Sequence, residues 1–154
     1  GLLGGLGILL ISIPAAAQRE DRITVTINSV KAIDKADIFG RADFYAKVTI
    51  AGETQSTPVA RQTNSIRPYW KISKAVPRGT HAIKIQMFDK DPAKPDDLID
   101  INRLDNKRDL DFEINTANCR ITGFAGPYSC GDVIVRTGNE RKKAEIRFTV
   151  KVGR

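Results

Sequence analysis

The sequence predicts an all-β protein, an eight-stranded antiparallel β-sandwich. Apolar and polar residues alternate with a period of two in several short runs, which is the pattern of a strand with one buried face. Gly, Pro and Asn separate these runs at fairly regular intervals. No run shows the periodicity of a long amphipathic helix, so two packed sheets are the layers that can bury the apolar faces.

We expect strands, in chain order, over residues 23–28, 44–50, 57–61, 69–72, 83–87, 110–114, 133–135 and 146–152. The clearest is the last, where Ile146, Phe148 and Val150 alternate with polar residues. Residues 99–107 fit no strand pattern and leave room for one helical turn. Trp70 is predicted to pack in the core, and His81 to have a structural role.

Composition favours a single domain that binds anionic partners and performs no catalysis. The 154 residues carry 41% hydrophobic residues, enough for one core, and a net charge of +7. The single histidine, His81, has no arrangement of Ser and Asp that would make a catalytic triad. Gly-rich phosphate loops and zinc-ligand spacings are also missing from the sequence. Paired carboxylates could hydrolyse glycosides, but one Trp makes a poor sugar cleft.

Residues 1–17 are uncharged and resemble a signal peptide. An apolar run ends at Pro14 and is followed by three alanines, so we expect cleavage after Ala17 and a mature domain over residues 18–154. The predicted location is secreted, periplasmic or extracellular, with possible membrane association. An uncleaved anchor is the alternative, although the run is shorter than the roughly 20 apolar residues of a spanning helix.

The two cysteines, Cys119 and Cys130, are predicted to form a disulfide. Gly123, Gly126 and Pro127 between them have the composition of a loop, and thiols pair in an oxidising compartment. Two free thiols or a metal-bound pair are the alternatives, but His81 lies far from both cysteines in sequence.

Two segments concentrate carboxylates beside predicted strands. Residues 37–43 contain Asp37 and Asp43, and residues 89–99 contain Asp89, Asp91 and Asp97. Like charges held a few Å apart disfavour joint ionisation, and a hard cation relieves that repulsion. Calcium takes six to eight oxygen ligands in tolerant geometry, so a calcium site is the first hypothesis. The alternative is that Asp, Gly and Pro here are ordinary turn residues.

The spacing of these residues resembles that of the C2 domain, a calcium- and phospholipid-binding β-sandwich. Asp37 and Asp43 lie six positions apart, and residues 68–70 give the family's Pro-x-Trp segment. The second loop repeats the family's Asp-x-Asp followed six positions later by Asp and an apolar pair. The resemblance covers about residues 23–152. Phe44 replaces the usual Pro, Asp100 replaces the usual Gly, and the cysteine loop is not a general family feature.

The resemblance implies a division of labour within the two loops. The calcium ligands would be Asp37, Asp43, Asp89, Asp91 and Asp97. Ile38 and Phe39, at the tip of the first loop, would dip into the interface of an anionic phospholipid membrane. Arg41, Lys90 and Lys94 would contact head groups. The alternatives are that Phe39 folds back onto the sandwich and that these cations are simply solvated.

Two functions follow. The first is calcium-dependent binding to anionic phospholipid membranes. The second is an extracellular structural or adhesive role, in which calcium stiffens the loops and the basic surface binds a protein or an acidic polysaccharide. Nucleic acid is the less favoured partner because net charge alone supports it. A second anionic site could also form from basic residues on the polar strand faces, including Lys47, Lys71, Lys84, Arg147 and Lys151.

Overall fold

The computed structural model describes residues 1, 4–11, 19–33 and 41–154, which contain strands and no helix. The strands are β1 (Glu20–Ala32), β2 (Phe44–Ile50), β3 (Glu53–Ser56), β4 (Ser65–Ile66), β5 (Trp70–Pro77), β6 (Thr80–Asp89), β7 (Asp97–Ile99), β8 (Leu110–Asn115), β9 (Arg120–Thr122), β10 (Tyr128–Ser129), β11 (Ile134–Thr137) and β12 (Ala144–Gly153).

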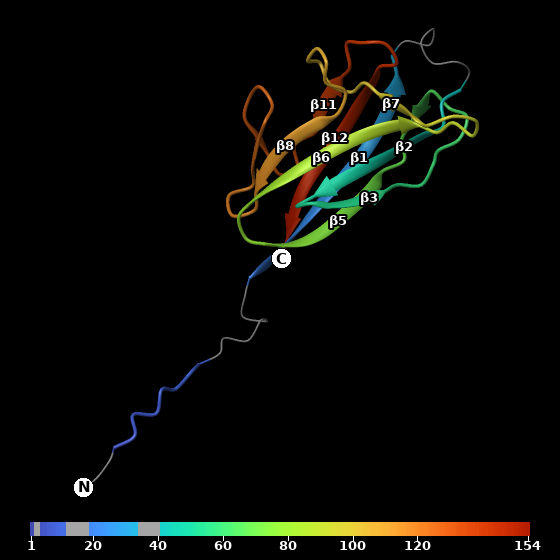
Figure 1. The fold of residues 1–154 in the computed structure, drawn as a ribbon. Helices are drawn as coiled ribbons and strands as arrows, with labels where there is room; N and C mark the ends of the chain where they lie inside the picture. Colours follow the sequence, from blue (N-terminus) through green and yellow to red (C-terminus); the bar gives the residue numbers. More distant parts are fainter. Residues whose placement is uncertain (2–3, 12–18, 34–40) are drawn as a thin grey trace.

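These strands form two facing sheets, which confirms the predicted antiparallel β-sandwich (Figure 1). The first sheet has the order β11-β12-β1-β4, and β5 also pairs with β1. The second sheet has the order β10-β9-β8-β6-β2-β3, and β7 also pairs with β6. The strand pairs within both sheets are antiparallel.

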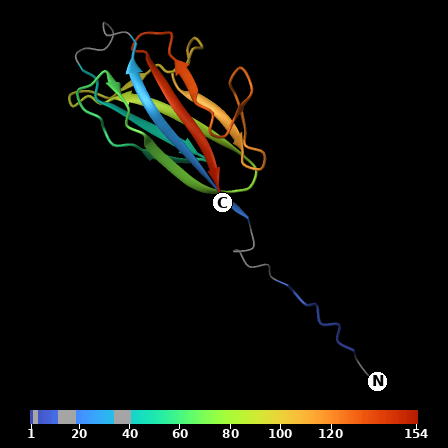
Figure 2. The same cartoon turned by 180° about the vertical axis from the view of Figure 1, so that it is seen from behind.

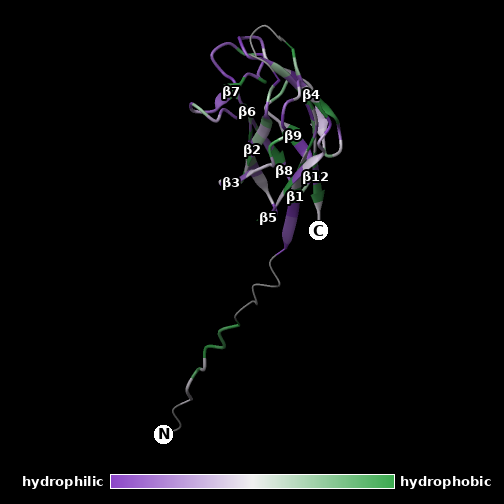
Figure 3. Ribbon diagram, turned by 90° about the vertical axis from the view of Figure 1, so that its right-hand side faces the viewer, coloured by the Kyte–Doolittle hydropathy of each residue, from purple (hydrophilic) through white to green (hydrophobic). Residues whose placement is uncertain are grey.

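Alternation along the long strands builds the core. In β1, the side chains of Ile23, Val25 and Ile27 are fully buried, and the polar residues between them face outward. The apolar residues of β12 are buried in the same way. Hydrophilic residues collect instead in the loops around β7 (Figure 3). Trp70 packs against the core but stays partly exposed, so it lies at the edge of the core and not at its centre.

Two local predictions were wrong. The third strand occupies residues 53–56 instead of 57–61, because Ala51 and Gly52 both adopt positive φ (47° and 83°). Two such residues make the tight turn that joins adjacent antiparallel strands, so pairing resumes at once after β2. Residues 99–107 form no helical turn; the side chain of Asn102 instead accepts the Leu104 N–H (2.9 Å) and donates to the Asp109 carbonyl (2.7 Å).

The first and last strands lie side by side, which fixes the two ends of the sandwich (Figure 2). Arg22 near the start of β1 is opposite Gly153 at the end of β12. At the other end, β1 finishes at Ala32, β2 begins at Phe44 and β6 finishes at Asp89. Both predicted calcium loops therefore belong to the end opposite the entry and exit of the chain.

Residues 4–11 have no regular secondary structure. Leu6, Ile8, Leu9, Leu10 and Ile11 expose at least 79% of their surface. Within the described part of the chain, no helix has the length and apolar character needed to cross a membrane. The predicted cleavage after Ala17 lies outside the described residues.

The disulfide between Cys119 and Cys130 is confirmed, with 5.2 Å between the Cα atoms. It closes the β9–β10 hairpin, where the Cys130 N–H also donates to the Cys119 carbonyl (3.0 Å). Phe124 inside the closed loop packs on Phe112 and Phe148, so the disulfide fixes part of the core's edge.

Candidate functional site

Three of the predicted ligands converge because their strands are neighbours. In the second sheet, β6 pairs with β2 on one side and with β7 on the other. This register places Asp89 opposite Phe44, the residue after Asp43, and also opposite Asp97. Like charges directly opposite one another in a sheet are destabilising. The pairing of Asp89 with Asp97 therefore carries an electrostatic cost.

Backbone hydrogen bonds join the first predicted loop to the second. The Asp43 N–H donates to Asp89 Oδ1 (2.9 Å), and the Lys90 N–H donates to the Asp43 carbonyl (2.9 Å). The Asp43 carboxylate accepts the Gln62 N–H (2.6 Å). Asp43 and Asp89 are thus held beside each other by the main chain, whatever the ionisation of their carboxyl groups.

Asp89 is the most strongly perturbed of these carboxylates. Partial burial raises its pKa, and the nearby charges of Asp43 and Asp97 raise it further. The hydrogen bond from Asp43 and the charge of Lys142 act in the opposite direction. The net rise shows that this part of the site carries more negative charge than its surroundings compensate.

The loop between β6 and β7 is organised by Asp96, which sequence reasoning did not select. Asp96 Oδ1 accepts the Asp91 N–H (2.9 Å), and its Oδ2 accepts the Tyr45 hydroxyl. These two hydrogen bonds lower the pKa of Asp96. Burial and the contact with Asp96 raise the pKa of Tyr45 to about 12. Asp91 in turn accepts the Ala93 N–H (2.9 Å), which closes a tight turn at the loop tip.

Two lysine ammonium groups lie against the acidic residues. Lys142 Nζ donates to Asp97 Oδ2. Lys94 Nζ lies 3.8 Å from Asp91 Oδ2 and 3.9 Å from Asp97 Oδ2. The protein's own cations therefore supply part of the positive charge that the carboxylates require.

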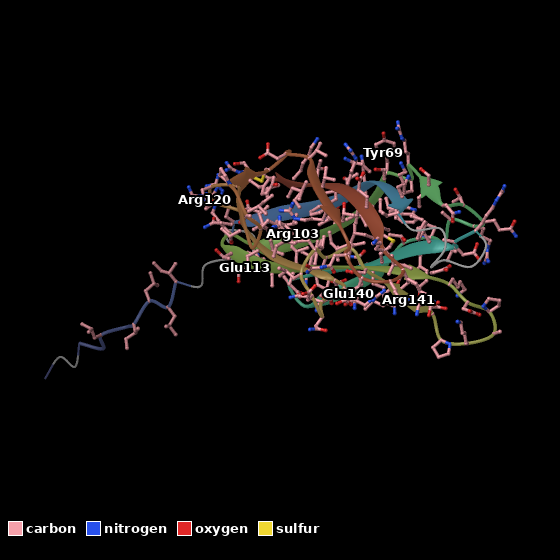
Figure 4. All side chains as sticks on the ribbon, turned by 90° about the horizontal axis from the view of Figure 1, so that it is seen from above. Tyr69, Arg103, Glu113, Arg120, Glu140 and Arg141 are labelled. Atoms are coloured by element: carbon pink, nitrogen blue, oxygen red, sulfur yellow. A yellow bond between two sulfur atoms is a disulfide. The ribbon has the colours of Figure 1, made fainter. Side chains whose placement is uncertain are left out.

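The position of Lys142 is set by the turn between β11 and β12. Its backbone is left-handed (φ 55°), which is uncommon for a residue other than glycine. Arg108 holds this turn against β7 by donating to the carbonyls of Leu98 (2.9 Å), Arg141 and Lys142 (3.4 Å). Figure 4 labels Glu140 and Arg141 on the same turn.

Asp100 fixes the other side of the same turn. Its carboxylate is fully buried and accepts the N–H groups of Asn102 (3.0 Å), Asn139 (3.0 Å) and Glu140 (2.8 Å). The residue that departs from the family pattern is therefore a structural carboxylate. It holds the turn that carries Lys142, and its place in the sequence after the apolar pair gave no sign of this role.

The remaining predicted residues have different outcomes. Asp37, Ile38 and Phe39 lie outside the described residues. Arg41 and Lys90 are exposed at the loop end, whereas Lys94 lies against Asp91 and Asp97.

Within residues 19–33 and 41–154, no group of three or more His, Cys, Asp and Glu side chains is arranged to hold a metal ion. Several of the carboxylate oxygens are engaged with N–H groups or with ammonium groups instead. The donor set is nonetheless all oxygen, which suits a hard cation such as calcium.

Comparison with known proteins places this geometry in a family. The family model of the C2 domain matches residues 21–116, and no curated protein matches the chain. Among solved structures, the two tandem C2 domains of Extended-Synaptotagmin 2 superpose with a TM-score of 0.62 at 14% identity, covering 99% of this chain and 46% of that one. The calcium-bound form of the same domains gives 0.55 at 14% identity, covering 85% and 45%.

Human GIVD cytosolic phospholipase A2 is also similar in fold, with a TM-score of 0.54 at 13% identity. The match covers 86% of this chain and 17% of the phospholipase chain, so the chain spans about a sixth of that enzyme's length. At these identities the structural matches show a shared fold. With the family model matching well over half of its residues, the chain belongs to the C2 domain family.

Proposed function

We propose that this protein is a binding module, without catalytic activity, that attaches to anionic phospholipid membranes when calcium is bound. The observation that carries the proposal is the convergence of Asp43, Asp89 and Asp97 at one end of the sandwich, with Asp91 in the adjoining loop. The raised pKa of Asp89 and the two ammonium groups beside Asp91 and Asp97 support it, because both indicate a site that attracts cations.

The described residues suggest how each part would act. Asp43, Asp89, Asp91 and Asp97 would provide carboxylate oxygens, with Asp37 completing the set that the family pattern implies. Bound calcium would reverse the local charge and offer open coordination positions to lipid phosphates. Arg41 and Lys90, exposed at the same end, would then contact head groups, and Ile38 and Phe39 would enter the interface.

The proposed location is outside the cytoplasm. The Cys119–Cys130 disulfide supports export because such bonds persist in oxidising compartments. The signal-like segment over residues 1–17 points in the same direction.

Calcium titration by calorimetry tests the metal site directly. The double variant Asp89→Asn/Asp91→Asn keeps the side-chain oxygens that accept the N–H groups of Asp43 and Ala93, so it should fold normally. We expect the wild-type protein to bind calcium at or below the roughly 10⁻³ M typical of extracellular modules, and the variant to give no binding heat in that range.

The matched control is Glu113→Gln/Asp132→Asn, which removes the same charge from β8 and from the β10–β11 connection. This control should bind calcium like the wild-type protein. Equal calcium affinity in the Asp89/Asp91 variant and the wild type would remove these aspartates from the site. Sedimentation with anionic vesicles then tests the membrane step separately.

A further inference from the structure

The outer face of the first sheet carries a second feature that the calcium site does not explain. Two adjoining hollows lie on it and share Asn28 and Tyr69. Their lining includes five cationic side chains and one carboxylate, that of Glu145. We call this surface the basic face; its cations are Lys31, Arg67, Lys71, Arg147 and Lys151.

The basic residues predicted from strand patterning divide between the two sheets. Lys71, Arg147 and Lys151 belong to the basic face. Lys84, on the second sheet, is paired with Asp109 (3.2 Å) and Asp111 (3.3 Å), and Lys47 lies 5.1 Å from the centre of the Phe88 ring. The second sheet's lysines thus have partners within the protein.

The cations of the basic face are largely uncompensated. Arg147 pairs with Glu145 (3.2 Å). Within the described part of the chain, the side chains of Lys31, Arg67, Lys71 and Lys151 have no hydrogen-bonded or ionic partner. All four residues are exposed, so the face presents positive charge to solvent.

A β-bulge shapes the middle of this face. The register between β1 and β12 shifts between Ile27 and Ser29, so Asn28 is the extra residue. Bulges bend a strand and redirect its side chains, and they are common next to functional sites. Here the bulged Asn28 lies where the two hollows meet.

Tyr69 forms the rim of both hollows in an unfavourable conformation. Its φ is 48°, a left-handed value that is a genuine outlier for a bulky residue, and 59% of its surface is exposed. Backbone strain of this kind persists where the surrounding structure enforces it, and it clusters at ligand sites. Figure 4 labels Tyr69 on the loop that precedes β5.

Hydroxyl and amide groups separate the cations. Thr26 lies between Lys71 and Thr149, and Thr24 lies between Ser73 and Lys151. Strands in a sheet lie about 4.8 Å apart and side chains on one face recur about every 7 Å, so neighbouring cations are spaced by rows of neutral donors and acceptors. This pattern matches a chain whose anionic groups alternate with hydroxyl-bearing units.

We propose that the basic face binds an acidic polysaccharide, a uronate-containing glycan, without calcium. Carboxylates of the glycan would meet the lysine and arginine side chains, its hydroxyls would meet Asn28 and the threonines, and Tyr69 would pack on a sugar ring. Single-stranded nucleic acid favours several stacking aromatics, whereas the lining of these hollows supplies one. A recessed, hydroxyl-rich surface also suits a linear chain better than a bilayer.

The test is calorimetric titration of the full chain with polygalacturonate in the presence of chelator, which excludes binding through the calcium loops. We expect binding to the acid polymer and none to its methyl ester, which lacks the charge. Lys71→Glu/Lys151→Glu should weaken binding about tenfold, because two exposed charge contacts of ordinary strength combine to that factor.

The matched control is Arg103→Glu/Arg120→Glu, which makes the same charge change at residues outside this face (Figure 4). Tyr69→Asn keeps a residue that tolerates left-handed φ, so it should weaken binding without lowering the melting temperature.

Four results would overturn the proposal: equal weakening in the control, unchanged affinity in the Lys71/Lys151 variant, equal binding to the ester, or tighter binding to single-stranded DNA or anionic vesicles in chelator. None of these depends on the calcium site.

Discussion

At Asp89, burial and two neighbouring carboxylates favour the same protonation state, the neutral one. The main chain nevertheless holds Asp89 next to Asp43 and opposite Asp97. Individual residues around this position offset the repulsion in different ways: Lys142 with its charge, and Tyr45 with a hydrogen bond that steadies the adjoining loop through Asp96. Each of these effects can be measured at a single residue.

Lys142 is expected to compete with calcium for Asp97. Replacing it by glutamine removes the ammonium group and should raise calcium affinity by about threefold, the effect of losing one partly exposed charge contact. Lys143→Gln, which makes the same charge change one residue away, should leave affinity unchanged in the same calorimetric titration. Equal affinities for Lys142→Gln and the wild type would contradict this role.

Tyr45 should dissociate its phenolic proton at about pH 12, above its ordinary pKa of 10.0. Because the folded-state pKa is raised, the stability that this proton contributes is present below pH 10 and is lost as the pH rises through about 12. Phenolate absorbance during an alkaline titration will measure this step, and Tyr45→Phe should remove it. A wild-type titration with no phenol near pH 12 would show that the contact with Asp96 is absent.

At the scale of elements, strand alternation and turn residues predicted most of the fold. Every buried position of β1 from Ile23 to Ile27 follows from a period of two, and so do Ile146, Phe148 and Val150 of β12. The third strand was misplaced because the weakly patterned residues 53–56 are fixed by pairing with β2, not by their own apolar residues.

The candidate site was partly predictable for the same reason. Asp43, Asp89 and Asp97 border strands, so spacing located them. The contacts of Lys142 with Asp97 and of Tyr45 with Asp96 join residues 45 and 51 positions apart, and they depend on how turns pack at the end of the sandwich. Local sequence patterns hold no information about such packing.

The turn between β11 and β12 should be intolerant of any side chain at Gly138. A Cβ there would lie 2.1 Å from the Asp100 carbonyl oxygen, so the backbone must shift. We expect Gly138→Ala to lower the free energy of unfolding by about 1–3 kcal/mol, the usual range for overpacking. Gly153→Ala, which meets no atom within 4 Å, is the control in urea denaturation. Equal midpoints for the two variants would contradict this packing.

The β9–β10 hairpin depends on its disulfide. Cys119→Ser/Cys130→Ser releases a loop with a sequence separation of 11 residues and should cost about 3 kcal/mol in the chain-entropy model. Denaturant unfolding of oxidised wild type and of the double variant measures the difference. Unfolding midpoints that coincide would show that hairpin packing alone holds this loop.

At the scale of the whole molecule, the calcium loops and the start of β1 occupy opposite ends of the sandwich (Figure 1). The 13 residues of β1 separate them by about 40 Å at the usual rise per residue. An uncleaved N-terminal segment would therefore hold the calcium end away from its own bilayer. A cleaved chain could turn that end toward any anionic surface.

Co-sedimentation with anionic phospholipid vesicles tests the central claim most directly. The chain is mixed with vesicles at physiological salt, in calcium or in chelator, beside neutral vesicles. The account predicts that the protein pellets with anionic vesicles in calcium alone, and that Asp89→Asn/Asp91→Asn stays in the supernatant. Equal pelleting with and without calcium, or no pelleting in either, would contradict it.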